Sequence, residues 1–217
     1  MSVADYMTKK VITISPDTKI NVAINTMKDN AIHRLPVIDG NQLVGLVTES
    51  SISEASPSKA TSLSIYEVNY LFNKMTVGEV MVKDVKTVSQ TAQLEDAIYQ
   101  MRQNNIGVLP VMDGADVVGI ITNNDILNAF LDITDYYKEA TVVQIFIKKD
   151  RTGVIGEIGT LMAEHAFNIQ TLMVTRNLGE IMIEMHVDRA DRDAVNTVLT
   201  EAGFEVRFVI DQPEHPA

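Results

Sequence analysis

The stretch IHRLPVIDG at residues 32–40 returns 74 positions later as IGVLPVMDG at residues 106–114. The likeness extends in both directions, so that residues 3–53 lie over residues 77–127 without a gap. An internal repeat is a strong architectural signal, because each copy leaves apolar surface that the other copy can cover. We expect the two copies to pack on each other and to leave a groove between them as a natural ligand site.

Each copy is predicted to fold as strand, helix, strand, strand, helix. In the first copy the β-branched run Val11–Ile14 predicts a strand. Leu35–Ile38 and Leu43–Val47 predict two more strands, joined by a hairpin turn at Asp39-Gly40-Asn41. The first helix of each copy is indicated by apolar residues at helical spacing: Ile20, Ala23, Ile24 and Met27, then Leu94, Ala97, Ile98 and Met101.

Two segments connect the copies. Residues 54–61 are predicted to be a linker, in which Pro57 prevents a continuous helix. Ser64–Glu67 fits a capping box that opens an extra helix. We expect this helix to lead into the second copy and to pack on the pair. Its apolar residues at helical spacing are Val68, Leu71, Phe72 and Met75.

After about residue 138 the pattern changes to βαββαβ, the order of a ferredoxin-like split βαβ unit. Its first helix follows the turn Asp150–Gly153, and its second opens at Asp191. A hairpin turn is expected at Arg176–Gly179, and the tail Asp211–Ala217 is expected to fray. The whole chain is therefore predicted to have a mixed α/β (α+β) fold. The predicted strands of this last part are Val142–Ile147, Asn168–Thr175, Glu180–Val187 and Phe204–Ile210.

Composition narrows the class of protein. The 217 residues are 46% hydrophobic and 22% charged, with a net charge of −11. This charge argues against broad binding to nucleic acid or to an anionic membrane, which needs a basic face. The chain has no cysteine, so disulfides and thiolate metal sites are excluded. No secretory signal and no membrane-length apolar run is visible, and we expect a cytoplasmic protein.

The most informative candidate site follows the last strand of the second copy, at Thr122-Asn123-Asn124-Asp125. A helix N-terminus here offers free N–H groups to a phosphate, and the Asp125 carboxylate suits a ribose diol. The same Thr-x-x-Asp spacing also fits a capping box that serves only the helix. The first copy has Ser51 in place of the carboxylate, and His33-Arg34 where the second has Gly107-Val108. One groove can therefore gather the basic pair and Asp125, unless His33 and Arg34 are merely a solvated turn pair.

The repeat resembles paired CBS domains (a Bateman module) over about residues 1–132. The resemblance is carried by the Asp/Glu-x-Met opening, the Leu-Pro-Val-x-Asp-Gly core and the Gly-x-x-Thr-x-x-Asp ending. It implies an adenosine ligand such as AMP, ATP or S-adenosylmethionine in the cleft between the copies. Ser51 departs from the ending motif, which puts the second cleft in doubt. The resemblance implies that ribose and phosphate are held by Thr122 and Asp125, that adenine is flanked by Thr13, Ile14 and the strand of Pro36, and that phosphates are reached by His33 and Arg34.

The C-terminal part resembles an ACT domain over roughly residues 140–210, on the segments Asp150–Gly156 and Asn168-Ile169. The resemblance implies a small effector, such as an amino acid, bound where the first strand meets the first helix, usually at a dimer interface. Gly153 would let an effector approach the helix N-terminus. A tight turn in a domain that only dimerises is the alternative. The implied effector-binding residues are Asp150, Gly153, Val154 and Asn168.

The complete layout resembles the AcuB-type acetoin utilization proteins, with the segment Ala60–Ser64 as a short marker. We expect a CBS domain at 1–59, a linker helix and second CBS domain at 60–134, an ACT domain at 138–211 and a tail at 212–217. The leading hypothesis is a non-catalytic, homodimeric ligand sensor that acts on an unknown target protein. A ligand-free interaction scaffold is the alternative, and an enzyme has the least support because no catalytic or metal-binding motif is found.

Overall fold

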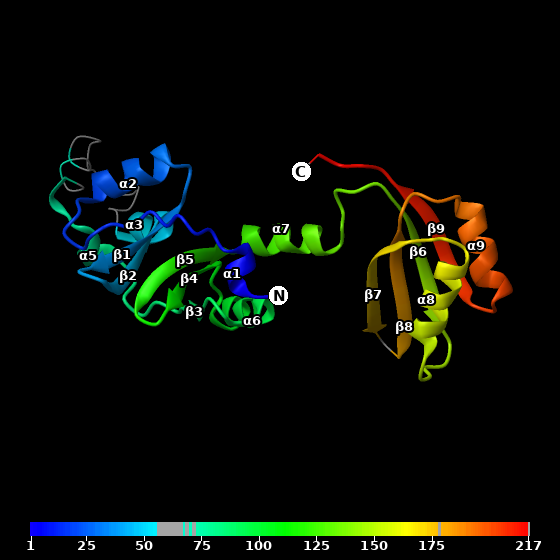
Figure 1. Cartoon of the computed structure of the whole chain (residues 1–217). Helices are drawn as coiled ribbons and strands as arrows, with labels where there is room; N and C mark the ends of the chain where they lie inside the picture. Colours follow the sequence, from blue (N-terminus) through cyan, green and yellow to red (C-terminus); the bar gives the residue numbers. More distant parts are fainter. Residues whose placement is uncertain (56–66, 68–69, 71–72, 178, 217) are drawn as a thin grey trace. The chain divides into compact units, whose positions relative to one another are not determined.

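The computed structural model describes residues 1–55, 67, 70, 73–177 and 179–216 (Figure 1). The chain divides into two compact units, Met1–Leu127 and Asn128–Ala217, and each is described by itself. The division falls inside one continuous helix, α7 (Asn123–Ile133). Most of the predicted linker, the first three residues of the capping box predicted at Ser64–Glu67, and Val68, Leu71 and Phe72 lie outside the described residues.

The first repeat forms a two-stranded antiparallel sheet covered by helices. Its core is formed by α2 and the hairpin, where Ile20, Leu35 and Val47 are fully buried. The hairpin turns at Gly40, whose φ of +60° suits glycine, as the sequence predicts. The elements are α1 (Val3–Tyr6), α2 (Ile20–Asp29), β1 (Arg34–Asp39), β2 (Gln42–Thr48) and α3 (Glu49–Ala55).

The second repeat has the same arrangement with one strand more. Its sheet has the order β3-β4-β5, in which β3 is parallel to β4 and β4 is antiparallel to β5. Both hairpins carry a register shift at the same place, after Val37 in β1 and after Val111 in β4. The elements are α5 (Val77–Val80), β3 (Val88–Ser89), α6 (Leu94–Asn104), β4 (Val108–Asp113), β5 (Asp116–Thr122) and α7.

The strand predicted at Val11–Ile14 is wrong except at its last residue. Only Ile14 pairs with β1, through an isolated parallel bridge to Val37. Its N–H donates to the Pro36 carbonyl at 3.1 Å, and its carbonyl accepts from the Ile38 N–H at 2.8 Å. The next pairing toward the N-terminus would need an N–H on Pro36, which proline lacks. The ladder therefore ends at Ile14, and Val11 to Thr13 are free to follow another path.

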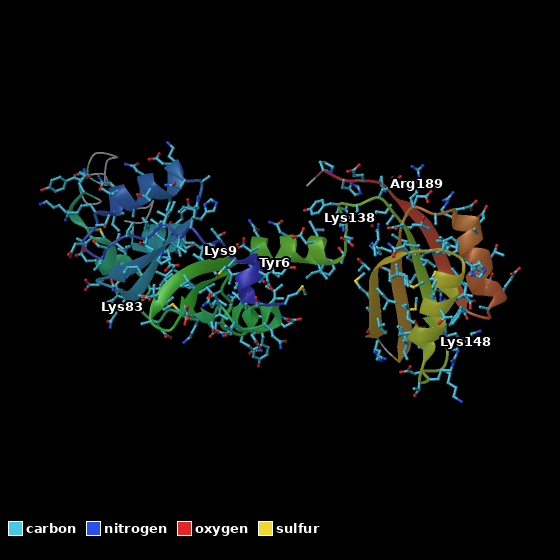
Figure 2. All side chains as sticks on the ribbon, viewed as in Figure 1. Tyr6, Lys9, Lys83, Lys138, Lys148 and Arg189 are labelled. Atoms are coloured by element: carbon cyan, nitrogen blue, oxygen red, sulfur yellow. The ribbon has the colours of Figure 1, made fainter. Side chains whose placement is uncertain are left out.

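The two repeats are intertwined through their opening segments. The Thr8 N–H donates to the Ile120 carbonyl of β5 at 2.9 Å and so joins the first opening segment to the second repeat. Figure 2 shows the neighbouring Lys9 beside β5. The Val82 N–H donates to the Leu46 carbonyl at 2.9 Å and makes the reciprocal connection. Each opening segment thus completes the other repeat.

Glycines at matched positions make this exchange possible. A Cβ on Gly119 in β5 would collide with the Met7 Sδ, and a Cβ on Gly45 in β2 would collide with the Met81 Sδ. The methionine of each opening motif therefore packs over the glycine of the partner repeat. This contact explains why each repeat has a methionine in its opening segment and a glycine in the second strand of its hairpin. The methionine side chain needs the space that the glycine leaves open.

The C-terminal unit has the predicted βαββαβ order and a four-stranded antiparallel sheet with strand order β7-β8-β6-β9. Helices α8 and α9 lie on one face of this sheet, as Figure 1 shows. Ile158 and Leu199 from the helices are fully buried against Ile145 and Ile183 from the strands. The elements are β6 (Ala140–Ile147), α8 (Val154–Glu164), β7 (Ile169–Asn177), β8 (Glu180–Val187), α9 (Arg192–Glu201) and β9 (Glu205–Gln212).

Several strand boundaries in this unit differ from the sequence-based prediction, and β6 begins two residues earlier, at Ala140. Strand β7 continues through Arg176 and Asn177, which had been placed in the turn. The tail is also better held than predicted, because β9 continues to Gln212. The Gln212 side-chain amide donates to the carbonyl of Lys138 at 2.9 Å, and the His215 ring stacks on Tyr136 with centroids 4.5 Å apart. These contacts fasten the tail to the segment that precedes β6.

Candidate functional site

A cavity of about 430 Å³ lies between the two repeats of the first unit. Residues from the first repeat form one side, and the end of β5 with the start of α7 forms the other. Five of the seven residues predicted to bind a nucleotide line it: His33, Arg34, Pro36, Thr122 and Asp125. The other lining residues are Thr8, Lys10, Val11, Ile12, Ala31, Ile32, Gly107, Ile120, Asn123 and Asn124.

Thr122 and Asp125 form a reciprocal cap at the start of α7. The Asp125 Oδ2 accepts from the Thr122 N–H and from the Thr122 hydroxyl, both at 2.7 Å. The Asp125 N–H donates back to the Thr122 hydroxyl at 3.4 Å. Both capping interactions of the carboxylate use the same oxygen, and within the described part of the chain Oδ1 has no hydrogen-bond partner. The carboxylate can therefore cap the helix and still present an acceptor to a ligand.

The first repeat makes the same cap without a carboxylate. The Ser51 hydroxyl accepts from the Thr48 N–H at 3.1 Å and donates to the Thr48 carbonyl at 3.0 Å. The Ser51 N–H donates to the Thr48 hydroxyl at 3.0 Å. A serine is thus sufficient to begin this helix, so the acidic residue at position 125 supplies something that the cap does not require.

Arg34 extends from the first repeat to the start of α7. Its Nη1 donates to the Gly107 carbonyl at 2.8 Å, and the same carbonyl accepts from the backbone N–H of Asn123 at 3.2 Å. A Cβ on Gly107 would lie 2.9 Å from the Asn123 Nδ2, so a side chain here would crowd the site. The guanidinium is half-buried and lies beside the positive end of the α7 dipole. This arrangement concentrates positive charge at one end of the cavity.

His33 has a different partner. Its Nδ1 lies 3.1 Å from the Glu49 Oε2, and both side chains are exposed. The imidazole lines the cavity but already has a carboxylate neighbour, so it adds less free positive charge than Arg34.

Thr8 and Lys10 were missed from the sequence. They reach the cavity because the opening segment of the first repeat joins β5 of the second. Lys10 is exposed and makes no ion pair within the described part of the chain. The sequence feature that could have indicated Lys10 is the basic pair Lys9-Lys10. Its counterpart in the second repeat is Lys83-Asp84. Only the exchange of opening segments shows that the second lysine of this pair faces the cavity.

The other two residues predicted to bind a nucleotide, Thr13 and Ile14, do not line this cavity. Ile14 is bridged to Val37, and its side chain packs against the core of the first repeat. Thr13 is exposed and lines a different cavity, together with Lys9 and Asp116. Because the chain is not a strand before Ile14, the apolar residues of this segment that reach the first cavity are Val11 and Ile12.

The groove related to the cavity by the repeat would have a different charge. Position 84, the counterpart of Lys10, is aspartate, and Val108 is the counterpart of Arg34. Ser51 replaces Asp125, and Glu49 stands at the place of Asn123. The repeat is therefore symmetric in its fold but not in the charges that it presents.

The four residues predicted to bind an effector do not form one cluster within the chain. Gly153 precedes α8 with φ of +91°, and nothing lies within 4 Å of a Cβ built there. Asp150 is near this turn and pairs with Arg176 at 3.5 Å. Val154 is 9% exposed and belongs to the core. Asn168 follows the opposite end of α8, an 11-residue helix about 16 Å long, and donates to Asp188 at 2.8 Å.

The residues that the structure describes lack two further features. They contain no group of three or more His, Asp or Glu side chains that could hold a metal ion. No helix among them is long and apolar enough to cross a membrane.

Comparison with known proteins matches the repeat to one family. The family model described as "CBS domain" matches residues 3–58 and again residues 77–132. A protein described as uncharacterized protein MJ1225 from Methanocaldococcus jannaschii is 32% identical over 150 residues, which cover 65% of this chain and 52% of that protein. The chain thus spans about half the length of this relative.

Solved structures resemble the same part of the chain. A protein described as an acetoin utilization protein (AcuB) from Vibrio cholerae is 28% identical with a TM-score of 0.53, covering 62% of this chain and 93% of that one. CBSX2 in complex with AMP is 28% identical with a TM-score of 0.52, covering 61% and 97%. The CBS domain pair of MJ0100, in complex with 5′-methylthioadenosine and S-adenosyl-L-methionine, is 29% identical with a TM-score of 0.50, covering 60% and 95%.

Proposed function

We propose that this chain, which belongs to the CBS domain family through both of its repeats, is a non-catalytic ligand-sensing regulatory protein. Its ligand is an adenosine-containing molecule, held in the cavity between the repeats. One observation carries this proposal: Arg34 from the first repeat and Asp125 from the second line a single cavity at the start of α7. Relatives solved with AMP and with S-adenosylmethionine support the ligand class.

The residues of the cavity have complementary roles in this proposal. The free Oδ1 of Asp125 accepts from the ribose hydroxyls, while Oδ2 keeps its contact with Thr122. The N-terminus of α7 and the side chains of Arg34 and Asn123 face the phosphate side. The apolar side chains of Val11 and Ile12, with Pro36, provide a surface for the adenine ring.

The test is titration calorimetry of the whole chain with AMP, ATP, 5′-methylthioadenosine and S-adenosylmethionine. We expect at least one of them to bind, and Asp125→Ser to weaken that binding at least about tenfold, through loss of a charge-assisted hydrogen bond. Serine is the matched replacement because Ser51 caps the equivalent helix. Absence of binding by all four compounds would refute the proposal, and equal binding by Asp125→Ser would remove Asp125 from the site.

A ligand-free interaction scaffold is the second candidate. It is favoured by the cap at Thr122, which gives Asp125 a structural role without any ligand. Native mass spectrometry of the purified protein separates the two functions. A retained mass matching an adenosine compound contradicts the scaffold.

Three finer features belong to the same proposal. The C-terminal unit is an ACT domain that binds a small amino-acid-like effector near Gly153, supported by its βαββαβ order and the open space at that glycine. Because Asn168 lies at the other end of α8, a site that uses it as well as Gly153 needs a second copy of the chain, and we propose a homodimer. A cytoplasmic role in acetoin utilization is supported by the similarity to AcuB.

A further inference from the structure

We infer that the cavity takes phosphorylated adenosine ligands and discriminates against those without phosphate, such as 5′-methylthioadenosine, or with a net positive charge, such as S-adenosylmethionine. This inference rests on the proposed function and narrows its ligand class. It is carried by the charges that line the cavity and by how few of them are neutralised.

Two of the basic groups at the cavity lack an acidic partner. Lys10 makes no ion pair within the described part of the chain, and Arg34 has the neutral Gly107 carbonyl as its partner at 2.8 Å. His33 is the exception, because Glu49 lies 3.1 Å from it. Among the described residues that line the cavity, Asp125 is the one carboxylate, and the polar hydrogens of Thr122 already occupy its Oδ2.

Other described cations, such as Lys9 and Lys28, also make no ion pair, so the lack of a partner alone does not distinguish Lys10 and Arg34. What distinguishes them is that both line the same cavity, in a chain whose net charge is −11. Within the described part of the chain, the half-buried Arg34 bonds to a carbonyl and lies next to Lys10 and the N-terminus of the 11-residue helix α7. This arrangement favours an anion as the missing partner. A phosphate group supplies that charge, whereas a thioether does not and a sulfonium adds repulsion.

The repeat supplies an internal comparison. In the groove related by the repeat, Asp84 stands for Lys10 and Val108 stands for Arg34. The fold and the cap at Thr48 are preserved there without Lys10 and Arg34. Lys86 stands for Ile12 in that groove, but it pairs with Asp84 at 2.9 Å. Folding of a repeat therefore does not require Lys10 or Arg34, and their charges are available for binding.

The test uses two neighbouring lysines of the full-length chain. Lys10→Gln removes a cation from the cavity, while Lys9→Gln makes the same change beside it, on a residue that lines a different cavity with Thr13. Both variants change net charge equally, so long-range effects cancel in the comparison. Affinities for AMP, for 5′-methylthioadenosine and for S-adenosylmethionine are measured by calorimetry at low and at high salt.

We expect wild type to bind AMP at least about tenfold more tightly than 5′-methylthioadenosine, as a charge-assisted contact warrants. Lys10→Gln should weaken AMP about fivefold, the size of one exposed ion pair, and leave 5′-methylthioadenosine unchanged. Lys9→Gln should change neither. Added salt should weaken AMP binding alone, because screening acts on the phosphate contact.

Three outcomes overturn the inference. Equal or tighter binding of 5′-methylthioadenosine or S-adenosylmethionine refutes the preference for phosphate but leaves the proposed function standing. The same loss of AMP affinity in Lys9→Gln as in Lys10→Gln would show that only overall charge matters. Binding of none of these compounds refutes the proposed function and this inference with it.

Discussion

At the scale of single residues, the two repeats begin the same helix with different chemistry. Ser51 supplies a hydroxyl to the cap at Thr48, and Asp125 supplies a carboxylate to the cap at Thr122. Since either residue satisfies the backbone N–H groups at a helix start, the carboxylate is not needed for folding. Its presence at the cavity is therefore better explained by binding.

A stability measurement separates these two roles. Asp125→Ala removes the cap and should lower the free energy of unfolding by about 1 kcal/mol. Asp125→Ser should cost less than half of that, because serine restores the contact that Ser51 makes. Denaturant titration of both variants without ligand is the measurement. If serine and alanine cost the same, the cap of the first repeat does not transfer to the second.

Asp135, which follows α7, should make stability depend on pH. Its pKa is lowered chiefly by the hydrogen bond from the Lys138 side chain at 2.8 Å, and also by the Thr171 hydroxyl at 2.9 Å, with His186 nearby. A lowered pKa in the folded state means that the contribution is fully present above the unfolded value, about 3.9, and is lost as the pH falls through the folded one.

We therefore expect Asp135→Asn to destabilise the chain by about 1 kcal/mol at pH 7 and by much less at pH 2 to 3. Thermal unfolding of both proteins at each pH is the measurement. Glu139→Gln is the control, because its partner Arg189 is 79% exposed and such a pair contributes little. A deficit for Asp135→Asn that persists unchanged in acid would contradict the assigned cause.

At the scale of elements, the opening segments matter most, because each one completes the partner repeat. Met7 packs over Gly119 in β5, and Thr8 bridges to Ile120 in the same strand. This exchange brings Lys10 to the cavity. The positions of helices and strands alone do not reveal it, since the contact joins residues more than a hundred positions apart.

Gly119→Ala tests the exchange. The added methyl group must displace the Met7 side chain, and overpacking of this kind costs about 1 to 3 kcal/mol. Gly159→Ala in α8 is the opposite case, because nothing lies within 4 Å of a Cβ built there. That change should stabilise its helix by up to about 1 kcal/mol. Calorimetric melting of both variants gives the sign, and unchanged stability in Gly119→Ala would contradict the close packing.

The sequence predicted most elements because their apolar periodicity follows local packing. Ile20, Ala23 and Met27 are buried at helical spacing, and the hairpin at Gly40 turns as its residues indicate. The prediction was wrong where a residue far away in the sequence decides whether a strand can pair. Val11–Ile14 has the composition of a strand, but Pro36 cannot donate the hydrogen bond that would extend it.

At the scale of the whole molecule, a duplicated fold presents two grooves with unequal charges. The comparison of His33-Arg34 with Gly107-Val108, and of Asp125 with Ser51, was sufficient to predict that one groove gathers both polar groups. The structure places all three of these binding candidates, His33, Arg34 and Asp125, on one cavity. Lys10 could not be predicted, because its position depends on the exchange between repeats.

In the C-terminal unit, the order of helices and strands was predictable but the placement of the candidate site residues was not. Its βαββαβ order follows from alternation and turn residues, yet the sequence could not show that Asn168 and Gly153 lie at opposite ends of α8. Residues that a family resemblance assigns to one site therefore need not lie close together within a single copy of the chain. The tail was also misjudged, because the contact between His215 and Tyr136 joins residues far apart in the sequence.

The central claim is that one groove, and not its counterpart, holds an adenosine nucleotide. Hydrogen exchange of the full-length chain with and without saturating AMP tests it most directly, because bound ligand slows exchange where it orders the backbone. We predict slower exchange at residues 8–12, 32–36 and 120–126. We predict no change at residues 82–86 and 46–52, the counterparts of the first and the last of these segments. Equal protection of both grooves, or no protection at the first set, would contradict the claim.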